Sequence, residues 1–404
     1  MFLHAGDQWI RGSENVLLTV LRGLDRKRLH PVLVTNNAPL ARLAGEIVST
    51  FVYPLPNLMY DDNDRSLNVV GWMKSVATVA QSAIRQKSDV IYCNGGSTCQ
   101  IGYYVGKVIG APVIGHVHSP YNRRYVLAYR LHRANRVLFV SDSIQRSIRS
   151  KQRFHGHCNV IHNGVDVERF QPPPVRDSSW RMRLGIPTQS IVFGQVSSLI
   201  TRKGIDVLLR AFAILSRTEA QARLVIVGEG PDRQYFENIA REDGISDIVR
   251  FVGEQDPRPY YQHVFDVHVL ASRSDAFPLS PLEASASGLP GIGADVGGIP
   301  EQIAPGISGL LFAPENHEML AAQMSLLAKD ASYRRALGER ARTMAVERFS
   351  IERFCESVQN CILSTAGASQ VSGDSSVACT ERTRREQLED PVSIEAGSRC
   401  KSIR

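Results

Sequence analysis

Residues 267–301 read VHVLASRSDAFPLSPLEASASGLPGIGADVGGIPE, and this stretch is the most informative in the chain. It begins with an apolar run at Val267–Leu270 and reaches a second apolar run after residue 290. Between the two runs, Ser280 can cap a helix, Pro281 fits its first turn, and Gly288 can end it in the left-handed conformation. The spacing predicts a strand, a loop, a helix and a second strand, which is the unit that builds parallel sheets.

The same alternation extends along most of the chain. Short apolar runs bounded by Gly, Pro, Asn or Ser predict strands, and apolar residues at i, i+3, i+4 and i+7 predict helices at Val16–Leu24 and Val207–Leu215. The expected strands are Phe2–His4, Val32–Thr35, Val90–Cys93, Val113–His116, Val137–Val140, Val160–His162, Ile191–Gly194, Leu224–Val227, Val249–Val252, Val267–Leu270 and Gly291–Ala294. Strands that are apolar throughout indicate an α/β fold with parallel sheets covered on both faces.

The length of 404 residues, 43% of them hydrophobic, suggests two domains. Three consecutive prolines at residues 172–174 separate the two sets of strands. We expect an N-terminal Rossmann-like domain over 1–166, a linker over 167–188, and a second Rossmann-like domain over 189–345. A C-terminal helix should occupy 346–365 and can pack back on the N-terminal domain. The tail, 366–404, is rich in Ser, Arg and Glu and is expected to be disordered.

Several classes of protein are excluded by composition. No apolar run approaches the roughly 18 residues of a spanning helix, and the N-terminus has neither the basic nor the apolar region of a secretory signal. The seven cysteines form no CxxC pair and are too sparse for a disulfide framework. These features favour a cytoplasmic protein. The first strand is short, so either the sheet edge is trimmed or the natural chain begins earlier.

The net charge of +7 is concentrated in one window. Residues 123–153 hold nine basic side chains and one acid, Asp142, which gives this window a charge of +8. Such a window can attract nucleic acid, anionic lipid or an acidic substrate. No nucleic-acid recognition motif or aromatic platform accompanies it, so nucleic-acid binding is disfavoured.

Asp275 and Glu283 lie eight residues apart, on the expected loop and the expected helix start. Ligands of doubly wound sheets bind where strands end, and a helix N-terminus offers free backbone N–H groups that suit a phosphate. An isolated pair of this kind is more often a loop acid and a surface acid that complements the helix dipole.

The pair is not isolated, because the whole segment resembles the signature of glycosyltransferase family 4. The pattern E-x7-E, A-x3-G-x-P and G-G-x-x-E corresponds here to Asp275, Glu283, Ala284, Gly288, Pro290, Gly297, Gly298 and Glu301. The resemblance covers roughly residues 1–365. It includes Lys203-Gly204, the turn at residues 228–231, and the NGVD stretch at residues 163–166.

The resemblance implies the GT-B fold, in which two Rossmann-like domains face each other across a cleft. It also implies transfer of a sugar from a UDP- or GDP-sugar with retention of configuration. The acceptor would be a glycan, a lipid-linked molecule or a small molecule, as in polysaccharide biosynthesis. The acceptor would attack, and the nucleoside diphosphate would depart, on the same face of the sugar. The reaction would then need no nucleophilic side chain from the protein.

The resemblance also assigns roles by position. Glu283 would bind the donor ribose, Asp275 the transferred sugar, and Lys203 the leaving diphosphate, whose developing charge a cation stabilises. His118 matches the acceptor-side histidine and is preferred over His116. The remaining donor-binding candidates are Gly12, Arg202, Gly228, Gly230, Phe251, Val252, and the backbone amides of Phe277 and Leu279.

Three positions depart from the family pattern: Asp275 stands where Glu is commoner, Ser198 where an Arg is common, and Arg11 where a Gly is usual. They motivate an alternative, a nucleotide-sugar-binding protein with weak or no transferase activity.

No Asp-x-Asp metal signature follows a strand. The acidic stretch at residues 61–64 lies in a polar loop, and we expect neither a metal ion nor another cofactor. The basic window suggests peripheral contact with anionic membrane.

Overall fold

The computed structural model describes residues 1–56, 58 and 68–371, and Met1–Ser369 form one compact unit. The acidic stretch at 61–64 and the expected tail beyond residue 371 lie outside the described residues. Among the helices that the structure describes, none combines the length and the apolar character needed to cross a bilayer.

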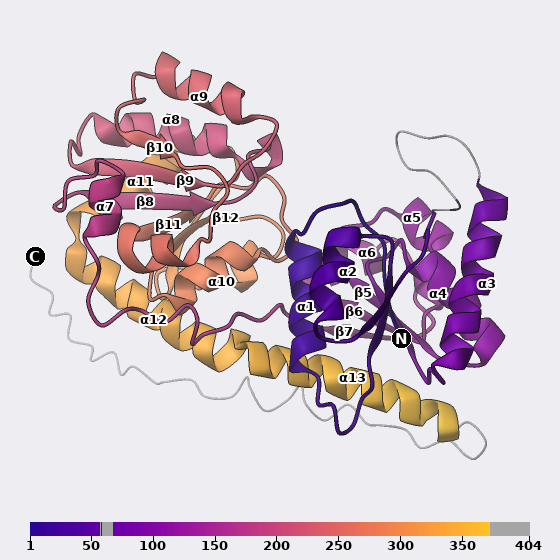
Figure 1. Cartoon of the computed structure of the whole chain (residues 1–404). Helices are drawn as coiled ribbons and strands as arrows, with labels where there is room; N and C mark the ends of the chain where they lie inside the picture. The colour runs from indigo at the N-terminus through magenta and orange to yellow at the C-terminus, as the bar shows by residue number, and fades with distance from the viewer. Residues whose placement is uncertain (57, 59–67, 372–404) are drawn as a thin grey trace, which may run out of the picture. The chain divides into compact units, whose positions relative to one another are not determined.

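The first half of the chain, which we call the N-lobe, is built on a seven-stranded parallel sheet (Figure 1). Its strand order is β3-β2-β1-β4-β5-β6-β7. The strands are β1 (Phe2–His4), β2 (Val32–Thr35), β3 (Ser49–Val52), β4 (Ile91–Asn94), β5 (Val113–Val117), β6 (Arg136–Phe139) and β7 (His157–Val160).

The second half, the C-lobe, is built on a six-stranded parallel sheet of order β10-β9-β8-β11-β12-β13. Its strands are β8 (Ile191–Val196), β9 (Ala222–Val227), β10 (Val249–Phe251), β11 (Val267–Leu270), β12 (Gly291–Ala294) and β13 (Gly309–Phe312). Two parallel α/β sheets of this doubly wound order give the expected GT-B architecture, and the α/β prediction is confirmed.

Helices lie on both sides of each sheet (Figure 1). They are α1 (Gly12–Gly23), α2 (Ala38–Gly45), α3 (Val69–Arg85), α4 (Cys99–Ile109), α5 (Arg123–Ala128), η1 (Leu131–Arg133), α6 (Asp142–Arg149), α7 (Ser179–Arg183), η2 (Thr201–Lys203), α8 (Ile205–Ser216), α9 (Arg233–Glu242), η3 (Tyr260–Val264), α10 (Leu279–Ala286), η4 (Ile299–Glu301), α11 (His317–Lys329), α12 (Ala331–Phe349) and α13 (Ile351–Val371).

Successive residues of one strand enter two different cores. In β1, Phe2 packs with one buried cluster and Leu3 with another. In β4, Tyr92 and Cys93 divide in the same way. Because side chains alternate across a strand, this division shows why the strands are apolar throughout: both faces of the sheet are covered.

The chain passes between the lobes twice at one place. Val165 donates its backbone N–H to Phe349 at 2.8 Å, and Ile351 donates to Val165 at 3.0 Å. The helical region expected at 346–365 is in fact divided, because α12 ends at Phe349 and α13 runs on to Val371. Residues 366–371 are therefore helical, although they were expected to belong to the tail.

Helix α13 packs on the N-lobe. Phe354, Cys355 and Val358 are buried in the same cluster as side chains of α1 and β1. At the far end, Arg136 donates to Thr365 Oγ1 and Asn159 Oδ1, both at 2.9 Å. The C-terminal helix of the described chain is thus part of the N-lobe core.

The strand predictions fail at sheet edges. The strand expected at Val160–His162 is β7 at His157–Val160, and two strands, β3 and β13, were not expected. β3, β7 and β13 are all edge strands. An edge strand is covered less completely, so its apolar signal is weaker: β3 reads STFV with none of its residues buried.

Candidate functional site

Each sheet has a point where its strand order changes direction. These points lie between β1 and β4 in the N-lobe and between β8 and β11 in the C-lobe. The loops that leave neighbouring strands there diverge, and the crevice between them is where such sheets bind ligands. Most of the predicted site residues follow these four strands or β5 beside them.

In the C-lobe, the structure brings Lys203 and Asp275 together. Lys203 Nζ lies 2.5 Å from Asp275 Oδ2, and their side chains are only 14% and 12% exposed. Ser272 Oγ donates to the same carboxylate oxygen at 3.3 Å. The lysine follows β8 and the aspartate follows β11, so a buried charge pair lies at the switch point of this sheet.

Arg202 does not join this pair. Its guanidinium Nη1 donates to the carbonyl of Ser274 at 2.8 Å, while the Arg202 carbonyl accepts from the Arg273 N–H at 2.9 Å. These bonds tie the loop after β8 to the loop after β11. Arg202 thus holds the backbone that carries Asp275.

The glycine pair of the GGIPE motif supports the same loop. Gly297 has a φ of +55°, and a Cβ at this position would lie 1.8 Å from the carbonyl oxygen of Asp275. Gly298 donates its N–H to that oxygen at 3.1 Å. Glycine readily adopts this conformation and has no side chain to prevent this approach. The motif therefore holds the backbone of Asp275 in place through its carbonyl oxygen.

Helix α10 starts earlier than its sequence suggested. Its N-cap is Pro278, so Ser280 lies inside the helix and is not the cap, and Glu283 lies in the second turn rather than the first. The amide of Leu279, at the first helical position, has no acceptor within the helix. Gly288 ends the segment with a φ of +73°, as predicted.

Glu283 is a strongly perturbed carboxyl group. Burial raises its pKa to about 7, although the hydroxyl of Tyr261 and the charge of Arg169 oppose the rise. A carboxyl group that titrates near neutrality in a half-buried position is a common feature of functional sites.

The other donor-side candidates gather around β9 and β10. Gly228 donates to the carbonyl of Gly253 at 2.8 Å, which joins the loops after these strands. Arg233 Nη2 donates to the Phe251 carbonyl at 3.2 Å. Val252 accepts from Gln255 Nε2 at 3.3 Å. A Cβ on Gly230 would lie 2.4 Å from the Leu199 carbonyl, so this turn packs closely on the loop after β8.

The side chain of Phe277 serves a different purpose from its backbone. Its ring is 3% exposed and stacks on His162 at a centroid distance of 4.6 Å. Its carbonyl accepts from Asn163 Nδ2 at 2.9 Å. The phenyl ring thus packs against the end of the N-lobe.

In the N-lobe, His118 follows β5 and is half-buried, whereas His116 is fully buried and pairs with the Tyr92 hydroxyl at 2.6 Å. Gly12 is the first residue of α1, and a Cβ added there would meet nothing within 4 Å. Arg11, which replaces the usual Gly, lies over the Trp9 ring at 4.0 Å.

Sequence reasoning missed three buried polar residues beside His118. Asn94 ends β4 and His4 ends β1, while Glu14 lies in the first turn of α1. His118 Nε2 lies 2.8 Å from Asn94 Oδ1, and Asn94 Nδ2 lies 3.0 Å from His4 Nδ1. The sequence did offer a signal for two of them: a polar residue is the last residue of each of the two apolar strands at the switch point, β1 and β4.

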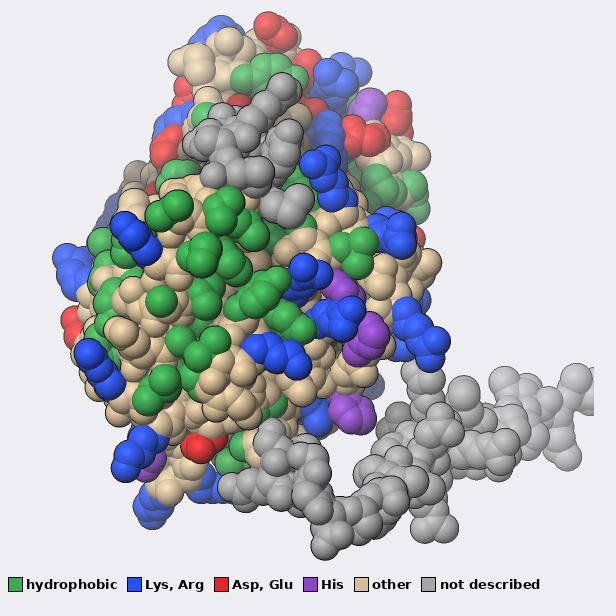
Figure 2. Space-filling view, turned by 90° about the vertical axis from the view of Figure 1, so that its right-hand side faces the viewer, with side chains coloured by type: hydrophobic (Ala, Val, Ile, Leu, Met, Phe, Trp, Pro, Cys, Tyr) green, Lys and Arg blue, Asp and Glu red, His purple; other side chains and the backbone are tan. Residues whose placement is uncertain are grey.

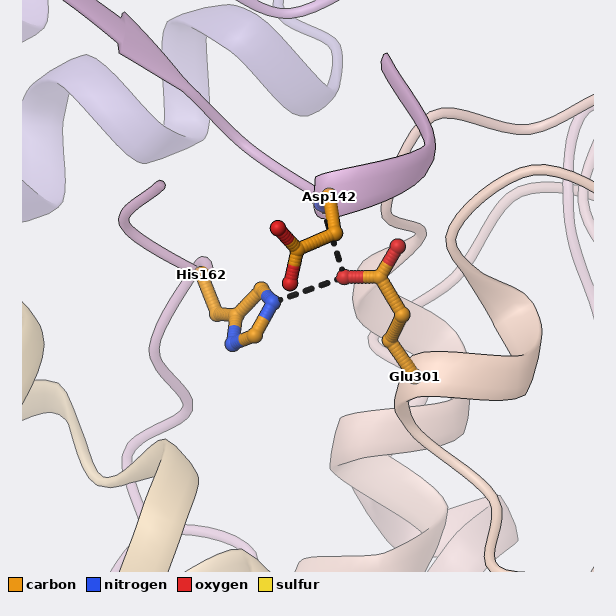
Figure 3. A group of neighbouring side chains, drawn as sticks. All are labelled: Asp142, His162 and Glu301. Carbon is orange, nitrogen blue, oxygen red and sulfur yellow. Dashed lines mark hydrogen bonds and ion pairs between the residues drawn. The ribbon is translucent and has the colours of Figure 1, made fainter. Parts of the chain in front are cut away.

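A group that could hold a cation lies where the lobes meet, formed by Asp142, His162 and Glu301 (Figure 3). Their ligand atoms lie within 4.8 Å of one another. The Glu301 carboxylate is already satisfied: it accepts from the N–H groups of Asp142 at 2.9 Å and Ser143 at 2.8 Å, and lies 2.9 Å from His162 Nε2. Glu301, the last residue of the GGIPE motif, therefore caps α6 of the opposite lobe.

The fold and these sites define the class of the protein. Two family models match consecutive parts of the chain: "Glycosyltransferase Family 4" over residues 10–169 and "Glycosyl transferases group 1" over 177–344. HepE of Anabaena in complex with UDP superposes with a TM-score of 0.79 at 21% identity, covering 90% of this chain and 99% of that one. Sucrose-phosphate synthase of Thermosynechococcus elongatus gives 0.76 at 21%, covering 91% and 98%. The chain has the GT-B fold of sugar-transferring enzymes.

Curated relatives agree with this class. D-inositol 3-phosphate glycosyltransferase of Corynebacterium kroppenstedtii is 33% identical over 48% of this chain and 45% of that protein. N-acetyl-alpha-D-glucosaminyl L-malate synthase of Bacillus anthracis is 28% identical over 57% and 59%. The matches span about half the length of these relatives. Both family models describe glycosyltransferases, and together they match residues 10–169 and 177–344, so the chain is similar to glycosyltransferases over most of its length, as its signature predicted.

Proposed function

We propose that this protein transfers a sugar from a nucleotide-sugar donor to an acceptor hydroxyl with retention of configuration. The observation that carries the proposal is the buried Lys203–Asp275 pair at the C-lobe switch point, beside the loop that leads into α10. When a diphosphate departs, negative charge develops on it, and a fixed ammonium group in a partly buried site stabilises that charge.

In this proposal Lys203 and Asp275 have different roles. A donor diphosphate attracts Lys203, and the Asp275 carboxylate, freed from the lysine, accepts hydrogen bonds from the sugar hydroxyls. Glu283 binds the ribose, and the Leu279 amide at the start of α10 donates to the phosphates. Lysine and backbone donors take the place of a metal ion, and a donor phosphate oxygen takes the acceptor proton.

A binding assay combined with donor hydrolysis distinguishes this proposal from the alternative of a binding protein without transferase activity. A transferase should release nucleoside diphosphate from its donor, and Lys203→Ala should slow the release about 100-fold while nucleotide binding is weakened. The matched control is Lys329→Ala, whose lysine is exposed at the end of α11. Tight nucleotide binding without release of nucleoside diphosphate from any UDP- or GDP-sugar would favour the alternative, a binding protein without transferase activity.

We further propose that the acceptor is anionic or lies at an anionic surface. Two relatives carry D-inositol 3-phosphate and L-malate in their names, which are anionic molecules. Here, every basic side chain of the 123–153 window except Arg136 is exposed on the N-lobe. Such a charge raises the local concentration of anionic partners.

One face of the N-lobe suits a lipid-linked acceptor. Along α3, Val69, Val70 and Met73 are 44%, 66% and 59% exposed. A hollow of about 640 Å³ nearby has apolar and guanidinium side chains in its wall, among them Trp72 and Arg123. Figure 2 shows hydrophobic side chains gathered with Lys and Arg on the side that carries α3. We propose that this face contacts an anionic bilayer, with a cytoplasmic location.

Liposome flotation tests this contact. Recovery with anionic vesicles should exceed recovery with neutral vesicles, and it should fall at high salt because the attraction is partly electrostatic. Met73→Asp should reduce recovery, whereas Val346→Asp, at a similarly exposed valine of α12, should not. Equal recovery with neutral and anionic vesicles would contradict the membrane proposal and leave the transferase proposal unaffected.

A further inference from the structure

A line of polar groups lies beneath His118 in the N-lobe. The Asn94 amide lies between two imidazole rings, with Oδ1 2.8 Å from His118 Nε2 and Nδ2 3.0 Å from His4 Nδ1. Beyond it, His4 Nε2 lies 3.0 Å from Glu14 Oε1. His4, Asn94 and Glu14 are between 2% and 5% exposed. An amide has one end that accepts and one that donates, so its orientation determines which ring nitrogens carry hydrogen.

A fourth group determines the orientation of the amide. The carbonyl of Ser13 lies 3.2 Å from Asn94 Nδ2. A carbonyl oxygen only accepts, so the NH2 group must face Ser13 and His4, and Oδ1 must face His118. The reverse orientation would place two oxygen atoms, Asn94 Oδ1 and the Ser13 carbonyl, against each other.

This orientation specifies the hydrogens on both rings. His4 Nδ1 accepts from Asn94 and is therefore bare, which places its hydrogen on Nε2, facing the Glu14 carboxylate. Glu14 Oε2 accepts further hydrogen bonds from the Arg11 N–H at 3.0 Å and the Ser13 hydroxyl at 3.1 Å. The buried carboxylate thus accepts two hydrogen bonds at Oε2, while the His4 ring lies beside Oε1.

The orientation of Asn94 also determines the tautomer of His118. Asn94 Oδ1 accepts, so His118 Nε2 carries hydrogen and, in a neutral ring, Nδ1 is bare. Burial, with the nearby rings of His116 and His4, holds the pKa of His118 well below its ordinary value, so the ring is neutral at physiological pH. Within the described part of the chain, Nδ1 of this ring has no hydrogen-bond partner.

We propose that Asn94 is a positioning residue that holds His118 in the Nε2–H tautomer, so that its bare Nδ1 accepts a hydrogen bond from a substrate hydroxyl. The substrate part of this inference rests on the proposed function, in which His118 contacts the sugar. The tautomer part does not, because the four groups that set it all belong to the free protein.

Long-range 1H–15N correlation spectra of the free protein test the tautomer directly, since the nitrogen shifts and coupling pattern of a neutral imidazole differ between its two tautomers. The spectrum of His118→Gln identifies the His118 resonances. We expect the Nε2–H pattern in the wild type and a mixture of both tautomers in Asn94→Ala. An Nδ1–H pattern in the wild type would overturn the proposal.

Kinetics test the consequence for substrate. Asn94→Ala should lower kcat/KM about tenfold, the value of one hydrogen bond, while Asn238→Ala on α9 should change it little. An unchanged kcat/KM in Asn94→Ala with a mixed tautomer spectrum would overturn the link between tautomer and substrate. An Nε2–H spectrum in a protein with no transferase activity would instead count against the proposed function alone.

Discussion

Replacing Glu283 by Gln should stabilise the free protein at alkaline pH, although it removes a proposed binding residue. Burial raises the pKa of this carboxyl group from 4.5 to about 7. Between these values the folded protein holds a proton that the unfolded chain has lost, so the stability of the wild type falls as the pH rises. Above pH 7 the folded protein keeps an ionised carboxylate in a poorly solvated position, and glutamine avoids this cost.

The size of the effect follows from the pKa. A tenfold change in proton affinity corresponds to about 1.4 kcal/mol, so a rise from 4.5 to about 7 corresponds to about 3 kcal/mol. The carboxylate is partly exposed, and solvent reduces the expected difference to about 1–2 kcal/mol. Glu283→Gln should therefore gain about 1–2 kcal/mol of unfolding free energy relative to the wild type between pH 5 and pH 8.

Urea denaturation without nucleotide at the two pH values measures this gain. Glu347→Gln, at an exposed glutamate of α12, is the matched control, and its difference in unfolding free energy from the wild type should be the same at pH 5 and pH 8. If the difference between Glu283→Gln and the wild type were the same at both pH values, a raised pKa of the Glu283 carboxyl group in α10 would be ruled out.

Three further predictions concern the donor side. Donor affinity of the wild type should rise as the pH increases through about 7, since the ionised Glu283 accepts from ribose, and titration calorimetry of Glu283→Gln should show no such rise. Lys203→Ala should lower kcat about 100-fold, with Lys329→Ala unchanged, in a steady-state assay. Gly297→Ala should lose activity and more than about 1–2 kcal/mol of stability, because its Cβ would meet the Asp275 carbonyl. Gly306→Ala, with a similar φ and open space around it, should lose stability only.

The sequence predicted the interior of the fold better than its margins. Strands such as β2, β11 and β12 were predicted to the residue because both of their faces are buried and, apart from His268 in β11, every side chain is apolar or small. β3 lies at a sheet edge, where incomplete cover removes that signal, whereas β13, at an edge of the other sheet, reads GLLF and was missed although its residues are apolar or small. The start of α10 was misjudged because Ser280 is a better cap by composition than Pro278, which is the residue that precedes the helix.

The candidate site was predicted in parts but not in its connections. Lys203 and Asp275 were expected on loops that follow strands, and they do lie there, but their ion pair joins residues 72 apart. The His4–Asn94–His118 line depends on β1, β4 and β5 lying side by side. Spacing along the chain specifies neither contact, because both arise from the order of strands in the sheet.

The central claim is that the chain transfers sugar from a nucleotide-sugar with retention. The most direct measurement incubates the purified protein with a panel of UDP- and GDP-sugars and follows the first-formed sugar product by 1H NMR. The account predicts nucleoside diphosphate release from at least one donor and a product with the anomeric configuration of that donor. A first-formed product of inverted configuration, or no release from any donor that binds, would contradict it.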